Sequence, residues 1–266
     1  MRGGHVPVLL KEAIDGLDVK PGGKYIDATF GSGGHTAEIG RRGGKVLAID
    51  VDPRAHAAVK GNFRDIEKIA KENGFESVSG ILFDLGVSSM QLDTPERGFS
   101  YRFSGPLDSR LDQTKGQSAR DIVNTYSEGE LYEIFTRFGE ENDARAIARA
   151  IVRARAIDHI TTTEGLVKVV GGSRPVLSRI FQALRIAVND ELGALREGLN
   201  GAGKLLINGG RLVVISFHSL EDRIVKQYMR SVNWKVLTKK PITANADEVK
   251  ANPRARSAKL RIAMRL

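Results

Sequence analysis

Three aspartates stand at or near the ends of short apolar runs, where buried strands would end. Asp27 lies in the run YIDATF, Asp50 closes KVLAID, and Asp84 closes ILFD. Such runs, separated by helical stretches, indicate a mostly parallel sheet covered by helices on both faces. Because ligands of open α/β sheets bind outside the carboxyl ends of the strands, we expect the three carboxylates to face one crevice.

The segment that contains Asp27 continues as a glycine-rich loop, DATFGSGGHT, over residues 27–36. Glycine is required where the backbone approaches a ligand closely or takes a positive φ, so the loop is typical of a nucleotide or nucleoside site. It departs from the dinucleotide fingerprint, because Thr36 stands where that pattern has its third glycine. Asp50, with Asp52 as a second carboxylate nearby, could accept hydrogen bonds from a ribose diol. This combination favours S-adenosylmethionine over NAD.

Asp84 is the candidate catalytic residue. The lone pair of a nucleobase amine is conjugated with its ring, so the amine is a weak nucleophile. A carboxylate that accepts the amine hydrogens would stabilise the positive charge that develops as the nitrogen attacks a methylsulfonium. The alternative interpretation of Asp84 is a cap of the following turn or helix.

The amino-acid composition excludes several kinds of site and mechanism. The chain of 266 residues has no cysteine, which excludes disulfides, thiolate metal sites and the thiolate used for methylation at carbon 5 of a pyrimidine. No cluster of His, Asp and Glu has recognisable metal-ligand spacing, so no metal is expected. No apolar run approaches the roughly 18–20 residues that span a bilayer. The run Val6–Leu10 is too short for the core of a signal peptide, so a cytoplasmic protein without membrane contact is expected.

The elements divide the chain into three stretches. Strands are expected at 25–30, 45–50, 81–84, 209–216, 234–238 and 259–263. Between the third and fourth of these runs the pattern is helical, with helices expected at 130–138, 144–156 and 176–195. The prediction is an α/β fold with an all-helical insert: residues 1–107 and 200–266 form the sheet domain and residues 108–199 the insert.

Basic residues are concentrated in two regions of a chain whose net charge is +9. Arg145, Arg149 and Arg153 are spaced to lie on one helix face of the insert. Residues 235–266 carry a second basic cluster, which includes Arg254 and Arg256. Two basic regions favour a polyanionic partner such as RNA. The alternative is a solvated face whose arginines pair with Glu140, Glu141 and Asp143.

Several longer motifs resemble one known family. They are DATFGSGGHT at 27–36, DLGVSS at 84–89, RGFS at 97–100, GPLD at 105–108, FQALRIAVN at 181–189, SFHSLEDRIVK at 216–226 and NPRARS at 252–257. In this order they are similar to the bacterial methyltransferases that modify the exocyclic N4 amine of a cytosine in the decoding region of 16S ribosomal RNA. The resemblance covers nearly the whole chain and implies a class I, Rossmann-like methyltransferase sheet with an inserted helical domain.

The resemblance also implies roles for individual residues. The implied contacts to S-adenosylmethionine are Gly33, Gly34, His35, Asp50, Phe63, Asp84 and Gln91. The implied partner is 16S rRNA in the small ribosomal subunit. Compared with the family, the chain is short in two places: between the Asp50 strand and Gly61, and around Gly171–Pro175.

The loop SFHS at 216–219 follows a strand end and is a candidate substrate-binding segment. Phe217 or His218 could hold a flipped cytosine by stacking or hydrogen bonding, together with the arginines named above as RNA contacts. Three other functions stay open. A DNA amine methyltransferase usually has a proline-rich loop, which Leu85–Val87 lacks. A nucleotide-binding oxidoreductase is disfavoured by the missing third glycine, and a non-catalytic RNA-binding module would have a degenerate cofactor pocket.

Overall fold

A seven-stranded sheet forms the centre of the first of two units in the computed structural model, which describes residues 7–55 and 57–266. Val6, the start of the short N-terminal apolar run, lies outside the described residues. The first unit comprises the chain up to Gly86 and Leu192–Leu266, and the second comprises Val87–Glu191. The strands are β1 (Lys24–Asp27), β2 (Lys45–Asp50), β3 (Val59–Lys60), β4 (Val78–Asp84), β5 (Leu206–Ser216), β6 (Trp234–Val236) and β7 (Lys259–Arg265).

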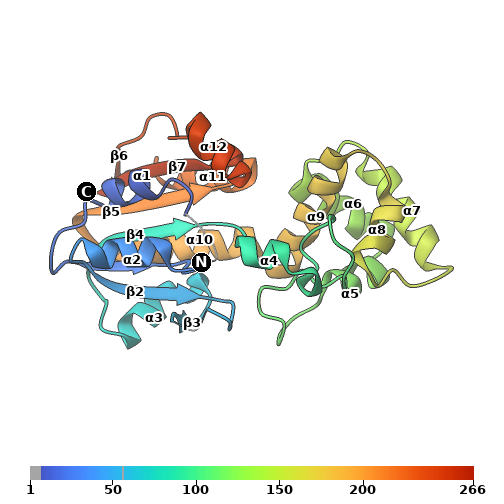
Figure 1. Ribbon diagram of the computed structural model, residues 1–266, viewed down its shortest axis with the longest axis horizontal. Helices are drawn as coiled ribbons and strands as arrows, with labels where there is room; N and C mark the ends of the chain where they lie inside the picture. Colours follow the sequence, from blue (N-terminus) through green and yellow to red (C-terminus); the bar gives the residue numbers. More distant parts are fainter. Residues whose placement is uncertain (1–6, 56) are drawn as a thin grey trace. The chain divides into compact units, whose positions relative to one another are not determined.

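The strand order is β3-β2-β1-β4-β5-β7-β6. Strands β1 to β5 pair in parallel, whereas β7 runs antiparallel to both β5 and β6. The connections reverse direction between β1 and β4, so the ends of these two strands form the switch point where open α/β sheets bind ligands. In Figure 1, β4 and β2 are labelled, and α2 is drawn between them in this view. The predicted mostly parallel α/β sheet is confirmed.

Helices cover both faces of this sheet. Side chains of α1 (Leu10–Leu17) and α2 (Gly34–Arg41) pack with Leu82, Val213 and Leu260 in one buried cluster. On the other face, Gly198 and Gly201 let α10 (Glu191–Leu205) approach Phe83 and α3. The remaining helices of this unit are α3 (Ile66–Glu72), α11 (Ser219–Tyr228) and α12 (Ala246–Ala251), with short 3-10 turns at Phe63–Asp65 and Pro253–Ser257.

The strand predictions hold in position and differ at their ends. The strand predicted at 25–30 ends at Asp27, where the glycine loop begins. Strand β4 starts at Val78, three residues earlier than the apolar run suggested, and β5 starts at Leu206, ahead of Gly209 and Gly210. The register between β4 and β5 shifts at this point, and Gly209 has a φ of 82°, so the apolar pattern is interrupted within a continuous strand. The two-residue β3 was not predicted.

The second unit is entirely helical apart from a single bridge between Pro106 and Thr162, within the described residues. Its helices are α4 (Ser89–Asp93), α5 (Ala119–Thr125), α6 (Glu128–Gly139), α7 (Ala144–Arg155), α8 (Thr163–Val170) and α9 (Arg174–Asn189), with a 3-10 turn at Pro95–Arg97. Ser118 and Ser127 cap α5 and α6 through reciprocal capping boxes. One buried cluster, which includes Leu131, Phe135 and Leu184, holds these helices together.

The continuous helix predicted at 176–195 is wrong. Asp190 takes a left-handed conformation (φ 46°) and divides it into α9 and α10. The side chain of Asn189 stabilises this break, because it accepts a hydrogen bond from the Leu111 N–H and donates to the carbonyl of Ser109. The unit boundaries at Gly86 and Leu192 therefore differ from the predicted 107/108 and 199/200, since the insert includes the motif loops before Asp108 and ends at this break.

Candidate active site

The glycine loop after β1 has the backbone geometry that its sequence predicts. Gly31 and Gly33 have φ values of 55° and 82°, and Gly33 is the N-cap of α2. A Cβ on Gly33 would lie 2.6 Å from the Phe30 ring, and one on Gly34 would collide with Pro7. These positions therefore require glycine, and the loop presents its backbone rather than side chains at the switch point.

The side chain of Asp27 holds the glycine loop in place through hydrogen bonds. Its carboxylate is fully buried and accepts hydrogen bonds from the Thr29 N–H (3.2 Å) and the Thr36 hydroxyl (2.7 Å). Burial raises the pKa of Asp27, and these hydrogen bonds oppose that rise. These contacts give Asp27 the role of positioning the turn.

Asp50 joins the end of β2 to the same loop. Oδ2 accepts the N–H of Gly31 (2.7 Å) and Oδ1 accepts the N–H of Asp52 (2.8 Å). Burial raises the pKa of Asp50, against the effect of these hydrogen bonds. Each carboxylate oxygen can accept a second hydrogen bond, so the group keeps capacity for a ribose diol. Asp52 instead accepts from the backbone N–H of Arg54 (3.1 Å).

Asp84 lies at the end of β4, and its surroundings are unusual for a carboxylate. The backbone N–H of Asp84 donates to the Thr29 hydroxyl (2.6 Å), and Oδ2 lies 3.7 Å from Nδ1 of the buried His35. Oδ1 is buried and has no hydrogen-bond partner among the described residues, although another edge of the side chain keeps it 25% exposed. Burial raises the pKa of Asp84 well above its ordinary value, and the negative charges of Asp27 and Glu221 raise it further.

The alternative role of Asp84 as a cap is wrong. Ser88 caps α4, and its hydroxyl accepts the Gln91 N–H. The Asp84 carboxylate therefore carries a desolvation cost that no cap bond offsets. A buried acceptor without a partner at a ligand-binding sheet edge is characteristic of a functional group.

Residues that sequence reasoning missed complete this arrangement. Thr29 anchors Asp84, Thr36 anchors Asp27, and Glu221 contributes a third buried negative charge near Asp84. The two threonines lie within the glycine motif, so their position was a usable signal. Glu221 is more than a hundred residues away from Asp84 in the chain, and only the pairing of β4 with β5 brings it close.

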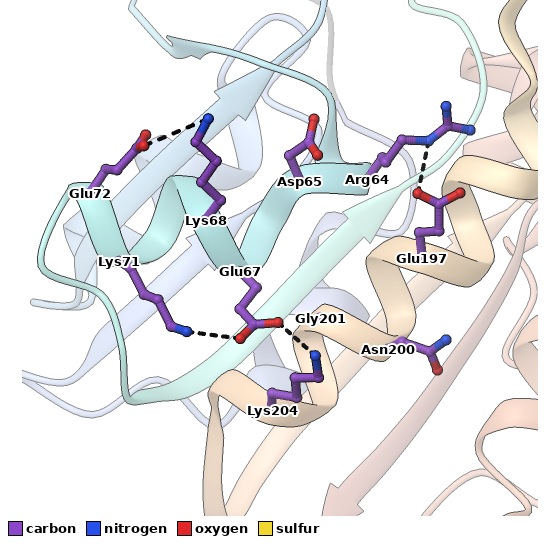
Figure 2. A pocket seen from close by; sticks show the side chains of 10 residues that line it. All are labelled: Arg64, Asp65, Glu67, Lys68, Lys71, Glu72, Glu197, Asn200, Gly201 and Lys204. Carbon is purple, nitrogen blue, oxygen red and sulfur yellow. Dashed lines mark hydrogen bonds and ion pairs between the residues drawn. The ribbon is translucent and has the colours of Figure 1, made fainter.

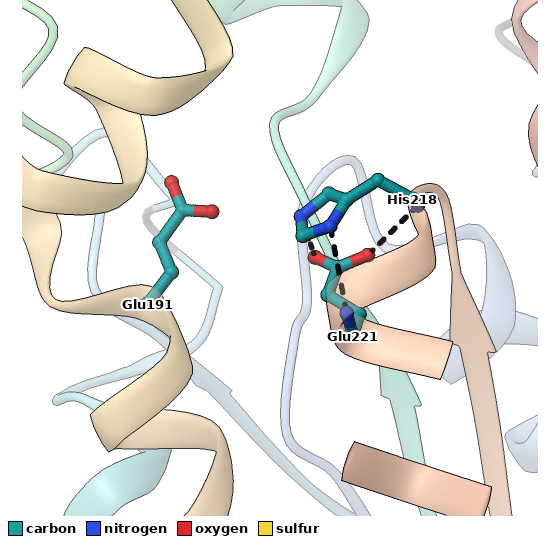
Figure 3. Close-up of side chains that lie close together, drawn as sticks. All are labelled: Glu191, His218 and Glu221. Carbon is teal, nitrogen blue, oxygen red and sulfur yellow. Dashed lines mark hydrogen bonds and ion pairs between the residues drawn. The ribbon is translucent and has the colours of Figure 1, made fainter. Parts of the chain in front are cut away.

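The loop after β5 is organised by Glu221, as Figure 3 shows. Oε2 of Glu221 accepts the N–H of Phe217 (2.8 Å) and that of His218 (3.3 Å), and His218 Nδ1 accepts the Glu221 N–H (3.4 Å). His218 is thus the N-cap of α11 in a capping box. Phe217 is half-buried and faces Gly86 in the loop after Asp84, because a Cβ on Gly86 would lie 3.6 Å from its ring. Phe217 is the residue of this pair whose side chain adjoins the Asp84 loop.

Phe63 begins the short turn before α3. Its ring packs edge-to-face on Phe83 at 5.6 Å, and α10 passes close by at Gly198. Despite the short segment after Asp50, the chain returns to the sheet: β3 pairs with the end of β2, and the Gly61 N–H donates to the Asp50 carbonyl (2.9 Å). Phe63 therefore lies one short turn from the end of β2, half-buried rather than enclosed in the core.

The remaining predicted residues lie in several places. Gln91 belongs to the second unit, where Oε1 accepts the Ser88 N–H (2.9 Å). Arg145, Arg149 and Arg153 are exposed on the face of α7 opposite its buried residues. In the first unit, Arg256 is exposed and Arg254 half-buried on the turn before β7.

The insert arginines do not pair with the acids proposed as their partners, within the described residues. Arg145 lies over the Tyr132 ring at 4.6 Å, and Arg149 lies 3.6 Å from Glu128. Glu141 is instead bound by Arg179 at 2.7 Å. Arg153 is therefore the arginine of the stripe with the least engaged side chain.

Comparison with known proteins decides the family. The model of the MraW methylase family matches residues 2–266. The chain belongs to this family. A protein of Thermomicrobium roseum named ribosomal RNA small subunit methyltransferase H is 48% identical, over 98% of this chain and 94% of its own. A protein of the same name from Carboxydothermus hydrogenoformans is 45% identical, over 98% of each chain.

The comparisons also bear on length and fold. The alignment with the Thermomicrobium protein has 305 positions, more than the 266 residues of this chain, so this chain lacks residues that its relative has. Among solved structures, TrmN from Thermus thermophilus matches with a TM-score of 0.47 and 12% identity, over 100% of this chain and 50% of that one. Within residues 7–55 and 57–266, every helix is too short or too polar to span a bilayer.

Proposed function

We propose that this chain transfers a methyl group from S-adenosylmethionine to the N4 amine of a cytosine in 16S rRNA, in the decoding region of the small ribosomal subunit. The proposal is supported by family membership and by two relatives named for activity on small-subunit rRNA. The observation that carries the chemistry is the buried, unpartnered Oδ1 of Asp84 at the switch point of the sheet.

The residues at this edge fit the cofactor. A backbone-lined glycine loop admits a ligand closely, and the Asp50 carboxylate retains acceptor capacity for ribose hydroxyls. The carboxylates of Asp27, Asp84 and Glu221 form a buried negative region without a lysine or arginine among the charges that act on Asp84, which suits a sulfonium cation. We assign cofactor contacts to Gly33, Gly34, His35, Asp50, Phe63, Asp84 and Gln91.

The chemistry follows from what Asp84 can accept. S-adenosylmethionine, when bound, supplies an electrophilic methyl group on a positively charged sulfur. Oδ1 of Asp84 accepts an N–H of the cytosine amine, which concentrates electron density on the nitrogen and stabilises its developing positive charge. Because its pKa is raised, the same carboxylate is a competent acceptor for the proton that the amine then loses. Nδ1 of His35 lies beside the carboxylate, 3.7 Å from Oδ2.

Phe217 holds the target base in this proposal. Its ring adjoins the loop that follows Asp84, and aromatic rings bind unstacked bases by stacking. The side chain of His218 caps α11, so in this proposal His218 positions the loop that carries Phe217. An enzyme of ribosomal RNA has its substrate in the cytoplasm, and we assign the chain to that compartment.

Five arginines are proposed to bind phosphates of the RNA: Arg145, Arg149 and Arg153 on α7, and Arg254 and Arg256 before β7. Replacing the three insert arginines with glutamine should lower the log–log slope of RNA affinity against salt by about two, since each lost phosphate contact removes about 0.7–0.9. Affinity for S-adenosylmethionine should not change. Titration of labelled 16S rRNA at several salt concentrations measures the slope, and an unaltered slope would leave the residues before β7 as the main contact.

Methyl transfer to defined substrates tests the proposed function. Small ribosomal subunits, free 16S rRNA and duplex DNA are incubated with S-adenosylmethionine labelled in its methyl group, and the products are digested to nucleosides. The expected product is N4-methylcytidine from ribosomal RNA. Label in duplex DNA, in 5-methylcytidine or in a 2′-O-methyl nucleoside would contradict the proposal, and so would cofactor binding without transfer to any substrate.

A further inference from the structure

A basic hollow lies on the first unit, at the side of the sheet where β7 and β6 follow β5. It has a volume of about 340 Å³ and is formed by the end of α11, by β6 with the loop that follows it, and by β7. Its lining residues are Lys226, Met229, Arg230, Val236, Thr238, Lys239 and Arg261. We call it the α11–β6 pocket. Four of these seven residues are cationic and none is acidic.

The cations of this pocket are largely available to a ligand. Lys226, Arg230 and Lys239 are exposed, and none of them has a carboxylate within ion-pairing distance among the described residues. Arg261 is buried and makes two hydrogen bonds to Asp222, from Nε (2.6 Å) and Nη2 (3.1 Å). Those two bonds hold the guanidinium in one orientation, so the most buried cation of the pocket is preorganised.

The pocket also has apolar walls. Met229 is 1% exposed and forms part of the lining, and Val236 is 38% exposed. The next residue, Leu237, is 39% exposed, and Val232 in the preceding turn is 90% exposed. A free phosphate would gain nothing from such surface, whereas the ribose and base of a nucleotide would bury it.

A second hollow on the same unit shows that this arrangement is not a general property of the surface. The groove between α3 and α10, drawn in Figure 2, is larger at about 610 Å³ and also contains several lysines. There, however, Lys68 pairs with Glu72, while Lys71 and Lys204 both pair with Glu67. Its cations are neutralised within the groove, so of these two hollows the α11–β6 pocket is the one with an excess of positive charge.

Protection of a sheet edge does not account for the charge. Strand β6 is the edge of the sheet, and a lysine such as Lys235 on it discourages pairing with another strand. Lys226 and Arg230, by contrast, come from the end of α11 and the turn after it, and Arg261 is on the inner strand β7. These three residues line the same hollow and belong to elements other than the edge strand.

We propose that the α11–β6 pocket binds the phosphodiester backbone of the RNA substrate, as a site separate from the one that receives the target base. The inference rests on the proposed function, because it takes RNA as the partner. Lys226, Arg230 and Lys239 contact phosphates, Arg261 supports the deepest contact, and the apolar wall receives a ribose or base. Such a contact anchors the RNA and contributes to its affinity without taking part in methyl transfer.

The test compares two triple variants with the same loss of charge. K226Q/R230Q/K239Q removes the free cations of the pocket, and K68Q/K71Q/K204Q removes three paired lysines of the groove between α3 and α10. Fluorescence anisotropy with a labelled fragment of the 16S rRNA decoding region, over a series of KCl concentrations, gives affinity and salt slope. The pocket variant should bind on the order of tenfold more weakly at moderate salt, with a slope lower by about two. The groove variant should match the wild type.

Two further measurements distinguish a loss of RNA binding from a loss of folding and from a loss of catalysis. Calorimetry with S-adenosylmethionine should give one dissociation constant for all three proteins, which establishes that the variants are folded. Methyl transfer should show a raised KM for RNA and an unchanged kcat in the pocket variant. If the wild type binds RNA through the pocket and yet transfers no methyl group, the proposed function fails and the pocket assignment stands.

Several outcomes would overturn the proposal. One is an unaltered salt slope in the pocket variant, and another is an equal loss in the groove variant. Displacement of RNA by inorganic phosphate, at fixed ionic strength and only from the intact pocket, would assign the hollow to a free phosphate. Binding to phosphatidylglycerol vesicles or duplex DNA that depends on the pocket, while RNA binding does not, would assign it to that other polyanion.

Discussion

Arg97 in the second unit and Asp84 in the first are charged residues of long motifs that are largely shielded from solvent, and their side chains are held in different ways. Arg97 of the second unit is 2% exposed, and Nη2 donates to the carbonyls of Arg110 (3.0 Å) and Leu111 (2.8 Å). Its guanidinium also lies 5.3 Å from the centre of the Phe99 ring. Asp84 of the first unit has a buried oxygen without a partner and lies in the field of two further carboxylates.

The difference distinguishes a charged side chain that stabilises the fold from one that we propose to act on a ligand. Arg97 ties the RGFS motif to the chain that follows GPLD, where Gly98 is also too close to Pro106 to carry a side chain. Its charge serves the fold, because the two carbonyls that accept from Nη2 and the Phe99 ring compensate part of the cost of its burial. Oδ1 of Asp84 has no hydrogen-bond partner among the described residues, and we propose that a ligand supplies one. Both residues stand in long motifs, and only the structure distinguishes their roles.

The largest expected effect is the loss of stability when Arg97 is replaced. Arg97→Met should lower the free energy of unfolding by about 3 kcal/mol, because it removes a buried guanidinium that donates to the carbonyls of two half-buried residues, Arg110 and Leu111. Urea unfolding followed by circular dichroism measures the loss. Arg102→Met, at an exposed arginine nearby, is the control and should leave stability unchanged. Equal stability of the two variants would mean that Arg97 is not structural.

The next effect concerns the cofactor. Asp50→Ala should weaken S-adenosylmethionine binding by about 1–3 kcal/mol, because it removes the ribose acceptor and leaves the Gly31 N–H unpaired. Isothermal titration calorimetry measures the dissociation constant. Asp52→Ala should bind normally, since Asp52 accepts from Arg54 rather than from the loop. The reverse order of the two variants would move the ribose contact to Asp52.

The smallest expected effect is a gain of stability when the carboxylate of Asp84 is replaced with an amide. Because the pKa of Asp84 is raised on folding, the folded protein holds its proton to a higher pH than the unfolded chain does. Stability is therefore lost as the pH rises from the ordinary pKa of aspartate through the raised one, and it stays reduced above that window. Asp84→Asn cannot ionise and should be more stable than the wild type by about 1 kcal/mol at pH 8.

This gain should disappear at low pH, below the ordinary pKa of aspartate, where the carboxyl of the wild type is protonated too. Thermal unfolding at several pH values, without cofactor, measures it. Asp27 and Asp50 have raised pKa values as well, so the wild type itself should lose stability in the same direction. A variant less stable than the wild type at pH 8 would mean that the ionised Asp84 is compensated within the free protein.

The sheet was readable from the sequence because its strands are buried and therefore continuously apolar. The runs at 45–50 and 259–263 coincide with β2 and β7 or fall within them. Strand β3 has two residues and no pattern of its own, and it exists only because β2 is beside it. The break at Asp190 was missed since Asn189 and the chain near Ser109 stabilise it together, across about eighty residues of sequence.

The candidate site was predicted in the same uneven way. Asp27, Asp50 and Asp84 can be recognised in the sequence as acids at strand ends. The glycine-rich segment can be recognised as a loop. The unpartnered oxygen of Asp84 and the charge of Glu221 depend on how distant segments meet, so no local pattern contains them. His218 was predicted as a base-binding residue, and its chemistry fits a cap equally well until Glu221 is seen.

The most direct test of the account is turnover of Asp84→Asn with S-adenosylmethionine at saturation. The change keeps the shape of the side chain and replaces a charged acceptor with an amide. Single-turnover methyl transfer to 16S rRNA is measured beside the dissociation constants for cofactor and RNA, so that a loss of binding is not mistaken for a loss of chemistry. The account predicts a rate at least about a hundredfold lower than that of the wild type, at full occupancy. A rate equal to that of the wild type would contradict it.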